Sequence, residues 1–189
     1  MFPLGHLGIT LAVAVGARHW LGDCRLDYRL VLVASLLPDL IDKPLSVAFG
    51  IGGRNIAHTF VFALTLTALF LYVWNRSGTG GRRAVWGATL LALAIGTWSH
   101  LVLDRMWVLP EILLWPFLGL AFPLDPFNPL TFLEGYRDPY VLLGDVAGAL
   151  ALGYLVWRSR LYRRPNLSRF LRKGRLKRGE EDLTRAGRG

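Results

Sequence analysis

Residues 84–104 read AVWGATLLALAIGTWSHLVLD, and this stretch decides the fold. About twenty consecutive, mostly apolar residues are what a helix needs to cross the hydrocarbon core of a bilayer. The run closes on His100 and Asp104, and an unpaired imidazole or carboxylate is costly to carry into lipid. These two residues are four apart, so on a helix their side chains face the same way and can bind one metal ion together. The alternative is a plain hydrogen-bonded pair that closes the helix.

Four further apolar runs occur in this chain of 189 residues, of which 53% are hydrophobic. The sequence therefore predicts an all-α fold, a polytopic integral membrane helix bundle with about five transmembrane helices. The expected spans are residues 4–21, 26–41, 56–74, 84–103 and 140–157. Pro44 is expected to end the second helix, because a proline pushes the residue before it out of the α region. Repeated prolines between residues 107 and 140 predict short interfacial or re-entrant helices.

Basic residues are distributed unevenly along the chain, whose formal net charge is +9. Five spans place eighteen of the 22 Lys and Arg residues on one face of the membrane, twelve of them from Arg158 onward. Cytoplasmic segments carry an excess of Lys and Arg, so this multi-pass cell membrane protein is expected to have its N-terminus outside and its C-terminus in the cytoplasm. The expected domains are a transmembrane metal-site domain, residues 1–157, and a basic cytoplasmic tail, residues 158–189, that contacts anionic lipids.

The same topology brings the polar residues of the apolar segments to the outer face. Three of the four histidines converge there, while His19 lies on the cytoplasmic side among arginines. The charge distribution alone sets the topology, so this convergence is an independent indication of a site. The predicted metal ligands are His6, Asp39, Asp42, His58, His100 and Asp104.

Imidazoles and carboxylates in these numbers suit Zn²⁺, with Mn or Fe as alternatives, in a site of one or two ions. Such a site activates water near neutral pH and polarises a phosphoryl oxygen. The predicted catalytic residues are Asp39, Asp42, Asp104 and Arg54, the last of which can pair with a phosphate oxygen. One of Asp39 and Asp42 is expected to be a ligand, with Asp39 favoured. Arg54 is alternatively a positive-charge anchor or a partner of Asp42.

Other features of the chain carry weaker signals. Asp145, inside the last apolar run, is expected to have a packing partner rather than a metal. Trp115-Pro116 fits an interfacial aromatic belt, with pocket lining as the alternative. The Gly-rich turn, residues 50–53, lacks the ending of a P-loop, so nucleotide binding is not expected, and no motif supports nucleic-acid binding. Cys24 is the only cysteine and forms no intramolecular disulfide. No basic residue precedes the first apolar run, which is expected to be a permanent helix rather than a signal peptide.

The order of these motifs resembles the YdjM-like family, which is described as membrane-bound metal-dependent hydrolases. The resemblance covers about residues 1–120. In that family the third motif more usually reads Arg-Gly-x-Thr-His-Ser, whereas Asn55-Ile56-Ala57 replaces its middle and Thr59 its last residue here. The motifs that carry the resemblance are His6, Leu37-Pro38-Asp39-Leu40-Ile41-Asp42, Gly53-Arg54-Asn55-Ile56-Ala57-His58-Thr59, Ser99-His100-Leu101-Val102-Leu103-Asp104 and Leu114-Trp115-Pro116.

The order His…Asp…His…His-x-x-x-Asp is also similar to the zinc-dependent phospholipase C and P1-type nuclease superfamily. That similarity implies a second metal near His6 that shares Asp104 with the first. The additional His/His/Glu cluster of the superfamily has no counterpart here, so a three-metal site is not expected. The ligands that the similarity implies for the first metal are Asp39 or Asp42, His58, His100 and Asp104.

These residues together predict a membrane-bound metal-dependent hydrolase that cleaves a phosphoester in a lipid or lipid-linked substrate at the extracytoplasmic face. One alternative is a non-catalytic membrane protein whose metal ion only clamps helix ends together. A transporter is the other alternative. It needs polar groups along a path through the bilayer, and the inner halves of the first, third and fourth expected spans are apolar.

Overall fold

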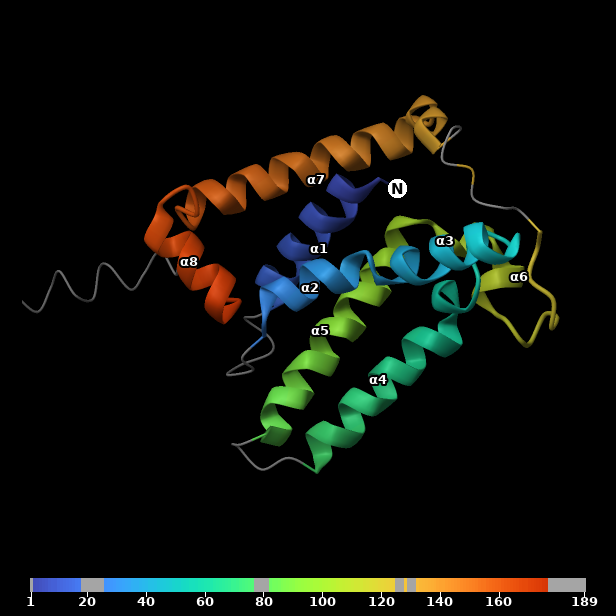
Figure 1. Ribbon diagram of the computed structural model, residues 1–189, viewed down its shortest axis with the longest axis horizontal. Coiled ribbons are helices and arrows are strands. Elements are labelled where there is room, and N and C mark those ends of the chain that lie inside the picture. The colour runs from blue at the N-terminus through green and yellow to red at the C-terminus, as the bar shows by residue number, and fades with distance from the viewer. Residues whose placement is uncertain (1, 18–25, 77–81, 125–127, 129–131, 177–189) are drawn as a thin grey trace, which may run out of the picture.

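A computed structural model describes residues 2–17, 26–76, 82–124, 128 and 132–176 of the chain (Figure 1). Within these residues the fold is all-α, as predicted, and contains no β-strand. Three 3-10 helices connect the α-helices: η1 (Ile56–His58), η2 (Met106–Val108) and η3 (Phe132–Arg137). The α-helices are α1 (Pro3–Ala17), α2 (Tyr28–Ser35), α3 (Leu37–Phe49), α4 (Phe60–Asn75), α5 (Arg82–Leu103), α6 (Pro110–Leu113), α7 (Pro139–Arg158) and α8 (Arg164–Lys173).

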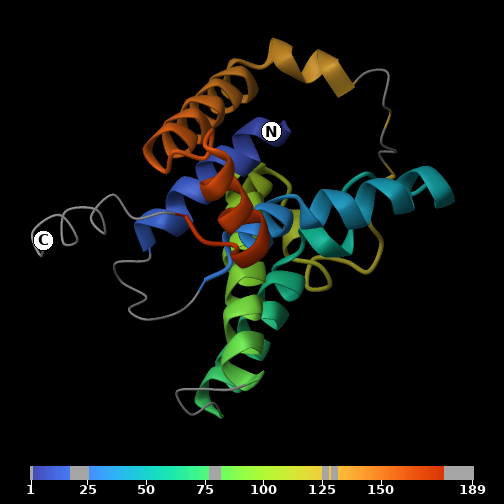
Figure 2. The ribbon, with the colours of Figure 1, turned by 60° about the vertical axis from the view of Figure 1, so that its left-hand side comes forward.

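Helix α5 is the centre of the bundle, because α1, α2 and α4 all pack against it. Helices α4 and α5 lie side by side, and α1 packs between α2 and the outer helix α7 (Figures 1 and 2). Leu11, Val31 and Leu91 belong to the main buried cluster, which joins α1, α2 and α5. A second cluster includes Leu101 and Met106 and lies where α5 ends.

Two close helix crossings depend on glycine. A Cβ built on Gly8 of α1 would lie 1.8 Å from the backbone oxygen of Gly148 in α7. A Cβ built on Gly96 of α5 would lie 2.3 Å from the Cβ of Ala34 in α2. No side chain fits into either gap, so the paired backbones approach each other directly. The second crossing brings the end of α2 against α5 one turn before His100.

The second predicted span differs from the structure. Residues 26–41 hold two helices, since α2 ends at Ser35 and α3 begins at Leu37. The expectation that Pro44 ends the helix is wrong, because α3 continues past it and stops at Gly50, whose φ is +64°. Pro44 lacks only the N–H that would have bonded the carbonyl four residues earlier, and the left-handed glycine supplies the actual stop.

The helices predicted at residues 84–103 and 140–157 are confirmed as helical segments, and the one predicted at 56–74 is a helix only from Phe60, because η1 and the extended Thr59 precede α4. By length and composition, two described helices can cross a membrane: Val85–Leu103 within α5, and α7. Only 17% of the apolar window of α7 is buried inside the structure, so its outer side chains need a cover of lipid or protein. Helices α1 and α4 are apolar but shorter, with 15 and 16 residues. Part of the first predicted span, residues 18–21, lies outside the described residues.

The first part of the basic tail packs against the bundle. Helix α8 ends at Gly174, which adopts the left-handed conformation. The Tyr28 N–H donates to the Gly174 carbonyl at 2.9 Å, and the Arg29 guanidinium donates to the Leu171 carbonyl at 2.5 Å. These bonds place the end of α8 at the start of α2, away from the end of α2 that contacts His100.

Candidate metal centre

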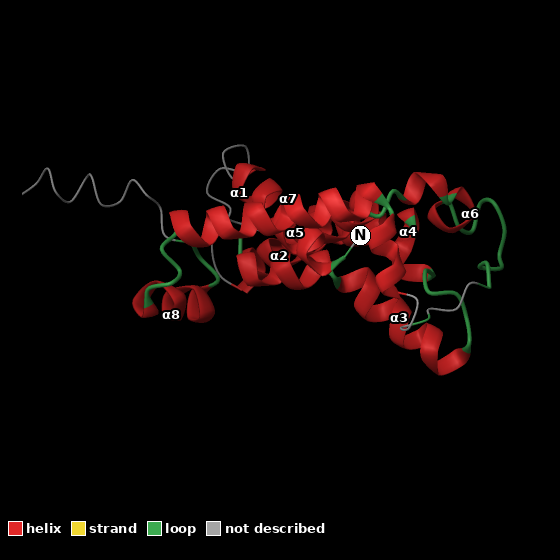
Figure 3. Cartoon of the chain, turned by 90° about the horizontal axis from the view of Figure 1, so that it is seen from above, coloured by secondary structure: helices red, strands yellow, loops and turns green. Residues whose placement is uncertain are grey.

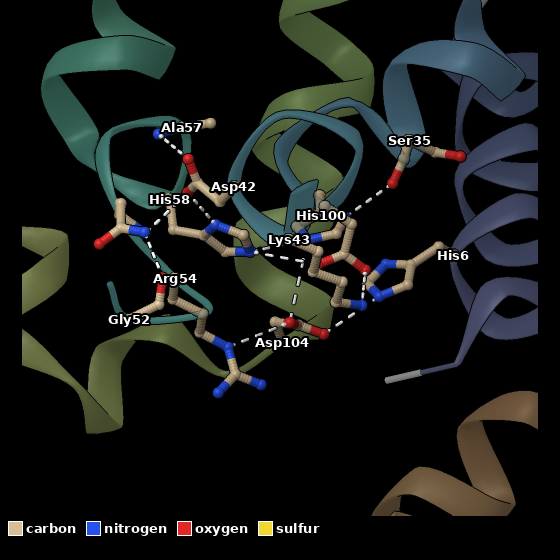
Figure 4. A network of polar contacts seen from close by, with 12 residues as sticks. His6, Ser35, Asp42, Lys43, Gly52, Arg54, Ala57, His58, His100 and Asp104 are labelled. Carbon is tan, nitrogen blue, oxygen red and sulfur yellow. Dashed lines mark hydrogen bonds and ion pairs between the residues drawn. The ribbon is translucent and has the colours of Figure 1, made fainter. Parts of the chain in front are cut away.

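The six predicted metal ligands lie together at one end of the bundle, although they come from four separate segments (Figure 4, which labels all but Asp39). The three histidine side chains at this end are completely buried. His6 lies near the start of α1, Asp39 and Asp42 on α3, His58 in η1, His100 in the last turn of α5, and Asp104 directly after α5.

Two of the imidazoles are held in place through their Nδ1 atoms. Nδ1 of His100 lies 2.7 Å from the carbonyl oxygen of Ser35, and Nδ1 of His58 lies 2.7 Å from Oδ2 of Asp42. A carbonyl or carboxylate oxygen only accepts, so in each ring Nδ1 carries the hydrogen and donates it. In the neutral imidazole, Nε2 is then an unprotonated acceptor.

The two Nε2 atoms of His58 and His100 face each other at 3.2 Å. Two acceptors at that distance repel each other unless a cation, a proton or a metal ion, lies between them. Oδ1 of Asp39 is 3.6 Å from Nε2 of His58 and 3.8 Å from Nε2 of His100. Oδ2 of Asp104 is also 3.8 Å from Nε2 of His100. Two carboxylates beside the imidazole pair favour a doubly charged cation over a single proton.

Each carboxylate also has one oxygen held by a neighbour. The ammonium group of Lys43 donates to Oδ2 of Asp39 at 2.6 Å, while Nε2 of His6 lies 3.0 Å from Oδ1 of Asp104. The His6 ring stacks on the His100 ring with centroids 4.1 Å apart. All four groups therefore share one arrangement, in which a neighbour fixes one polar atom and the other is presented to a common point.

The geometry of these four groups fits a metal ion. One donor atom from each of Asp39, His58, His100 and Asp104 lies within 4.8 Å of the others. Tetrahedral zinc with bonds of about 2.0–2.1 Å would place neighbouring donor atoms about 3.4 Å apart. The closest contacts among these atoms, between 3.2 and 3.8 Å, are close to that value. This cluster could therefore bind a metal ion, and its nitrogen and oxygen donors suit Zn²⁺.

The charge of the carboxylates also suits a cation. Burial raises the pKa of the Asp104 carboxyl, but the hydrogen bond from His6 and the nearby His100 outweigh it and hold the pKa well below its usual value. Burial likewise raises the pKa of Asp39, and the neighbouring His58, His100 and Lys43 side chains more than reverse this effect. Both side chains therefore carry a negative charge at neutral pH.

Asp42 lies next to this cluster and contacts His58. It is completely buried, and its carboxylate accepts hydrogen bonds from the N–H groups of Asn55 at 2.7 Å and Ala57 at 3.3 Å. With its oxygens in these contacts, Asp42 orients the His58 ring in the way that carboxylates hold metal-binding histidines in proteins. Of the two predicted aspartates, Asp39 is the one that presents an oxygen to both Nε2 atoms.

Arg54 lies on the more exposed side of the cluster. Its Nε atom is 3.6 Å from Oδ2 of Asp104, and its side chain is 42% exposed. The alternative that Arg54 pairs with Asp42 is wrong, since its ion pair is with Asp104. The two terminal nitrogens of the guanidinium point away from Asp104 (Figure 4). They are accessible to an anion that approaches the site from outside.

Sequence reasoning missed the groups that fix the ligands. Lys43 lies four residues after Asp39, and this i, i+4 spacing on a helix is the one signal that could have revealed it. The carbonyl of Ser35 and the N–H groups of Asn55 and Ala57 belong to the backbone. Every residue type except proline offers both groups, so no pattern of side chains announces them.

Asp145 has a packing partner, as predicted. Its Oδ1 accepts a hydrogen bond from the Gly5 N–H at 2.8 Å and its Oδ2 accepts one from the Tyr136 hydroxyl at 2.9 Å, which ties α7 to the start of α1. The Trp115 ring stacks on Phe122 with centroids 5.2 Å apart. The position of Trp115 in an interfacial belt stays a prediction.

A helical bundle with membrane-length apolar helices and a buried histidine–aspartate cluster at one end defines an all-α membrane protein with a candidate metal centre. The chain belongs to the YdjM inner membrane protein family, which it matches over residues 1–162. This match confirms the family predicted from the motifs and includes every predicted site residue. No curated protein and no solved structure matches the chain. The relation to the zinc-dependent phospholipase C superfamily stays a prediction.

Proposed function

We propose that this protein is a membrane-bound metal-dependent hydrolase that cleaves a phosphoester in a lipid or lipid-linked substrate at the extracytoplasmic face. One observation carries the proposal: the Nε2 atoms of His58 and His100 face each other at 3.2 Å beside two ionised carboxylates. Such a set of donors binds a divalent cation, with Zn²⁺ favoured over Mn or Fe. In an inner membrane protein, the phosphoesters nearest to such a site are those of lipid headgroups.

Each residue of the site has a separate role in this proposal. A bound ion would polarise a phosphoryl oxygen and lower the pKa of a water molecule, for which it would need a position beyond the four protein groups. Asp104 accepts the proton of the attacking water as the oxygen bonds to phosphorus and the ester P–O bond breaks. The leaving oxygen then takes a proton from solvent. Arg54 binds the phosphate oxygens, on which charge develops.

Asp42 and His6, the other two predicted ligands, hold two of the four proposed ligands in position. Asp42 orients His58, and His6 holds one oxygen of Asp104. His6 is not part of the group of donor atoms close enough to hold an ion in the described residues, and its Nε2 atom lies 3.0 Å from Asp104. This contact supports a site with one ion, held by Asp39, His58, His100 and Asp104.

We further propose that the chain passes the membrane five times, with the N-terminus outside and the C-terminus in the cytoplasm. In chain order, α1, α2, α4, α5 and α7 run alternately away from and toward the metal-centre end (Figure 1), although the eight residues of α2 cover only about 12 Å of a core of about 30 Å. Arg29 lies at the start of α2 and Arg76 directly after α4, in both cases at the end of the helix that is far from the metal centre. Helix α8 packs beside Arg29. This separation of basic residues from the metal centre supports the orientation.

The basic tail is proposed to bind anionic lipids of the cytoplasmic leaflet through α8. Leu167 and Leu171 of this helix are exposed as well. Each basic residue near an anionic surface contributes on the order of 1 kcal/mol to binding. The residues around an open hollow of about 610 Å³ on α8 are Arg164, Pro165, Ser168, Arg169, Arg172 and Lys173.

A structural metal ion is the competing function. The four proposed ligands come from α3, η1 and the end of α5, so one ion would tie three segments together. Such an ion would stabilise the fold without any turnover.

Turnover separates the two functions. Purified protein in lipid nanodiscs is incubated with phospholipids of different headgroups, and released phosphate or phosphorylated headgroup is measured. The hydrolase proposal predicts activity that a chelator abolishes and Zn²⁺ restores, that Asp39→Asn lacks, and that Asp145→Asn retains. Metal-loaded protein that a chelator unfolds, but that hydrolyses none of the substrates, would support the structural ion instead.

A further inference from the structure

Helix α3 presents its residues to the metal centre in a definite order around its axis. Successive residues on an α-helix are rotated by about 100°. Asp42 therefore lies on the buried side, Asp39 is rotated from it by about 60°, and Lys43 by about another 40°. Val47 and Leu40 follow on the next part of the circumference. Around the circumference of α3, from the buried side to the exposed side, a proposed metal ligand is therefore followed by a cation and then by an apolar strip.

The apolar strip, Leu40 and Val47, has no protein cover in the described structure. These side chains are 57% and 65% exposed. Helix α3 projects from the rest of the bundle, where η1, α2 and the end of α5 are its contacts (Figure 3). In an inner membrane protein, the cover that suits such a surface is lipid hydrocarbon.

Lys43 connects the strip to the metal centre. Its ammonium group bonds Asp39 at 2.6 Å, and its side chain is 24% exposed, so it borders both the ligand and the surface. With a divalent ion bound, Lys43, Arg54 and the ion carry four positive charges against the three negative charges of the aspartates. This excess of one positive charge attracts an anion to the open side of the site.

The surface beyond Arg54 is apolar as well. A Cβ built on Gly52 would lie 2.5 Å from the Pro123 carbonyl oxygen, so the loop before α7 packs directly on the Gly-rich turn that carries Arg54. Leu124, next to this contact, is 80% exposed. Lys43 therefore borders an exposed apolar strip, and the turn just before Arg54 contacts a segment with an exposed leucine.

We propose that Lys43, Leu40 and Val47 form a docking surface for one anionic membrane lipid, with the headgroup phosphate beside Lys43 and an acyl chain along the apolar strip. Lys43 and Val47 are four residues apart, about 6 Å along a helix, which matches roughly the first third of an acyl chain. This inference rests on the proposed function, because it makes the lipid the substrate. It assigns Lys43 to headgroup binding.

Photo-crosslinking tests the docking surface without turnover. Nanodiscs are prepared with a trace of phosphatidic acid that carries a diazirine in the middle of one acyl chain, and crosslinked peptides are identified by mass spectrometry. The expected result is preferential labelling of residues 37–49. Lys43→Met and the double variant Leu40→Gln/Val47→Gln should lower that labelling by about fivefold or more, equivalent to about 1 kcal/mol. Lys43→Arg should retain it.

Two controls separate this surface from ordinary lipid contact. Leu71 of α4 is exposed to a similar degree, 49%, and Leu71→Gln should leave labelling of α3 unchanged. Phosphatidylcholine with the same diazirine should label α3 several-fold less than phosphatidic acid. Equal labelling by the two lipids, or labelling of α3 that the Lys43 and strip variants do not change, would overturn the inference.

Metal content measured on the same samples distinguishes the two proposals. Protein that contains metal but shows no selective labelling of α3 contradicts the docking surface and leaves the hydrolase proposal standing. Protein without metal that still labels selectively contradicts the hydrolase and the contribution of the ion's charge, and supports Lys43 and the apolar strip alone as the docking surface. Absence of both metal and selective labelling contradicts both.

Discussion

Two buried acidic side chains near the start of α1 differ in what faces their oxygens. Asp145 is 5% exposed, and each of its oxygens receives a hydrogen, from the Gly5 N–H and from the Tyr136 hydroxyl. Asp104 is similarly buried, with one oxygen against His6. Its other oxygen lies 3.8 Å from Nε2 of His100, which is itself an acceptor, and 3.6 Å from Nε of the half-exposed Arg54 side chain.

The difference separates a structural carboxylate from a candidate ligand. A buried carboxylate surrounded by donors is already stabilised, and removal of a donor or of the carboxylate costs folding energy. A buried carboxylate beside acceptors needs a cation, and its removal costs cation binding. The same residue type at the same end of the bundle therefore serves two purposes, and the expected effects of metal removal and mutation differ accordingly.

Removal of the metal is expected to have the largest effect. With free Zn²⁺ at about 100 times its Kd, the ion contributes about 2.7 kcal/mol to stability, and a chelator removes this contribution. Thermal unfolding of purified protein, with and without chelator, measures the loss. The chelator should lower the melting temperature of Asp145→Asn by as many degrees as that of wild type, and it should hardly change the melting temperature of His58→Ala. A wild-type melting temperature that the chelator leaves unchanged would contradict the metal centre.

Substitution Asp42→Asn is expected to weaken metal binding by about 10–100-fold, because the amide no longer fixes the His58 ring as a carboxylate does. Competition with a chromophoric chelator measures the affinity. Ser46→Ala is the matched control, since Ser46 is a buried polar residue one turn further along α3 that bonds the Ile51 carbonyl. Equal metal affinity in Asp42→Asn and Ser46→Ala would show that Asp42 does not orient the ligand.

Substitution Asp145→Ala is expected to lower stability by about 1–3 kcal/mol, because two donors lose their acceptor. The metal content of this variant should equal that of wild type. Asp145→Asn should cost less, since its carbonyl oxygen still accepts one of the two hydrogen bonds. Thermal unfolding of the three proteins measures the effect, and loss of metal from Asp145→Ala at a temperature where it is folded would contradict the distinction.

A half-exposed carboxylate should give the smallest effect. Hydrogen bonds from the Arg29 side chain lower the pKa of Asp27 by more than its partial burial raises it. The resulting stability is present above the unfolded-state pKa of about 3.9 and is lost as the pH falls through the lower folded-state pKa. Asp27→Asn should therefore lower stability by less than about 1 kcal/mol at pH 7 and have no effect at the acid end of the range. A stability difference between wild type and Asp27→Asn that stays constant from pH 7 to the acid end would contradict the ion pair of Asp27 with Arg29 as its source.

The hydrophobic pattern predicted most of the helices but not where they break. Three spans follow uninterrupted apolar runs, and the structure has helices there. The break at Leu36 does not appear in the apolar pattern, but Pro38 marks it, because a proline is favoured in the first turn of a new helix. Pro44 is a strong local signal, yet α3 tolerates it, since one missing hydrogen bond costs less than the contacts that the rest of the helix makes.

The clustering of these residues at one end of the bundle was predictable, but not which of their atoms face each other. Charge distribution and spacing placed His58, His100 and Asp104 at one end of the bundle. Which of Asp39 and Asp42 points to the imidazole Nε2 atoms depends on the rotation of α3, which tertiary packing sets. The groups that select the tautomers include backbone atoms, such as the Ser35 carbonyl, and they leave no trace in the sequence.

Elemental analysis of purified protein tests the central claim most directly. Wild type is measured beside His58→Ala, His100→Ala and Asp145→Asn. The account predicts about one Zn, Mn or Fe per chain in wild type and in Asp145→Asn, and its loss from both histidine variants. Well-folded wild type that contains no metal, even after incubation with Zn²⁺, would contradict the account. The facing Nε2 atoms of His58 and His100 would then share a proton.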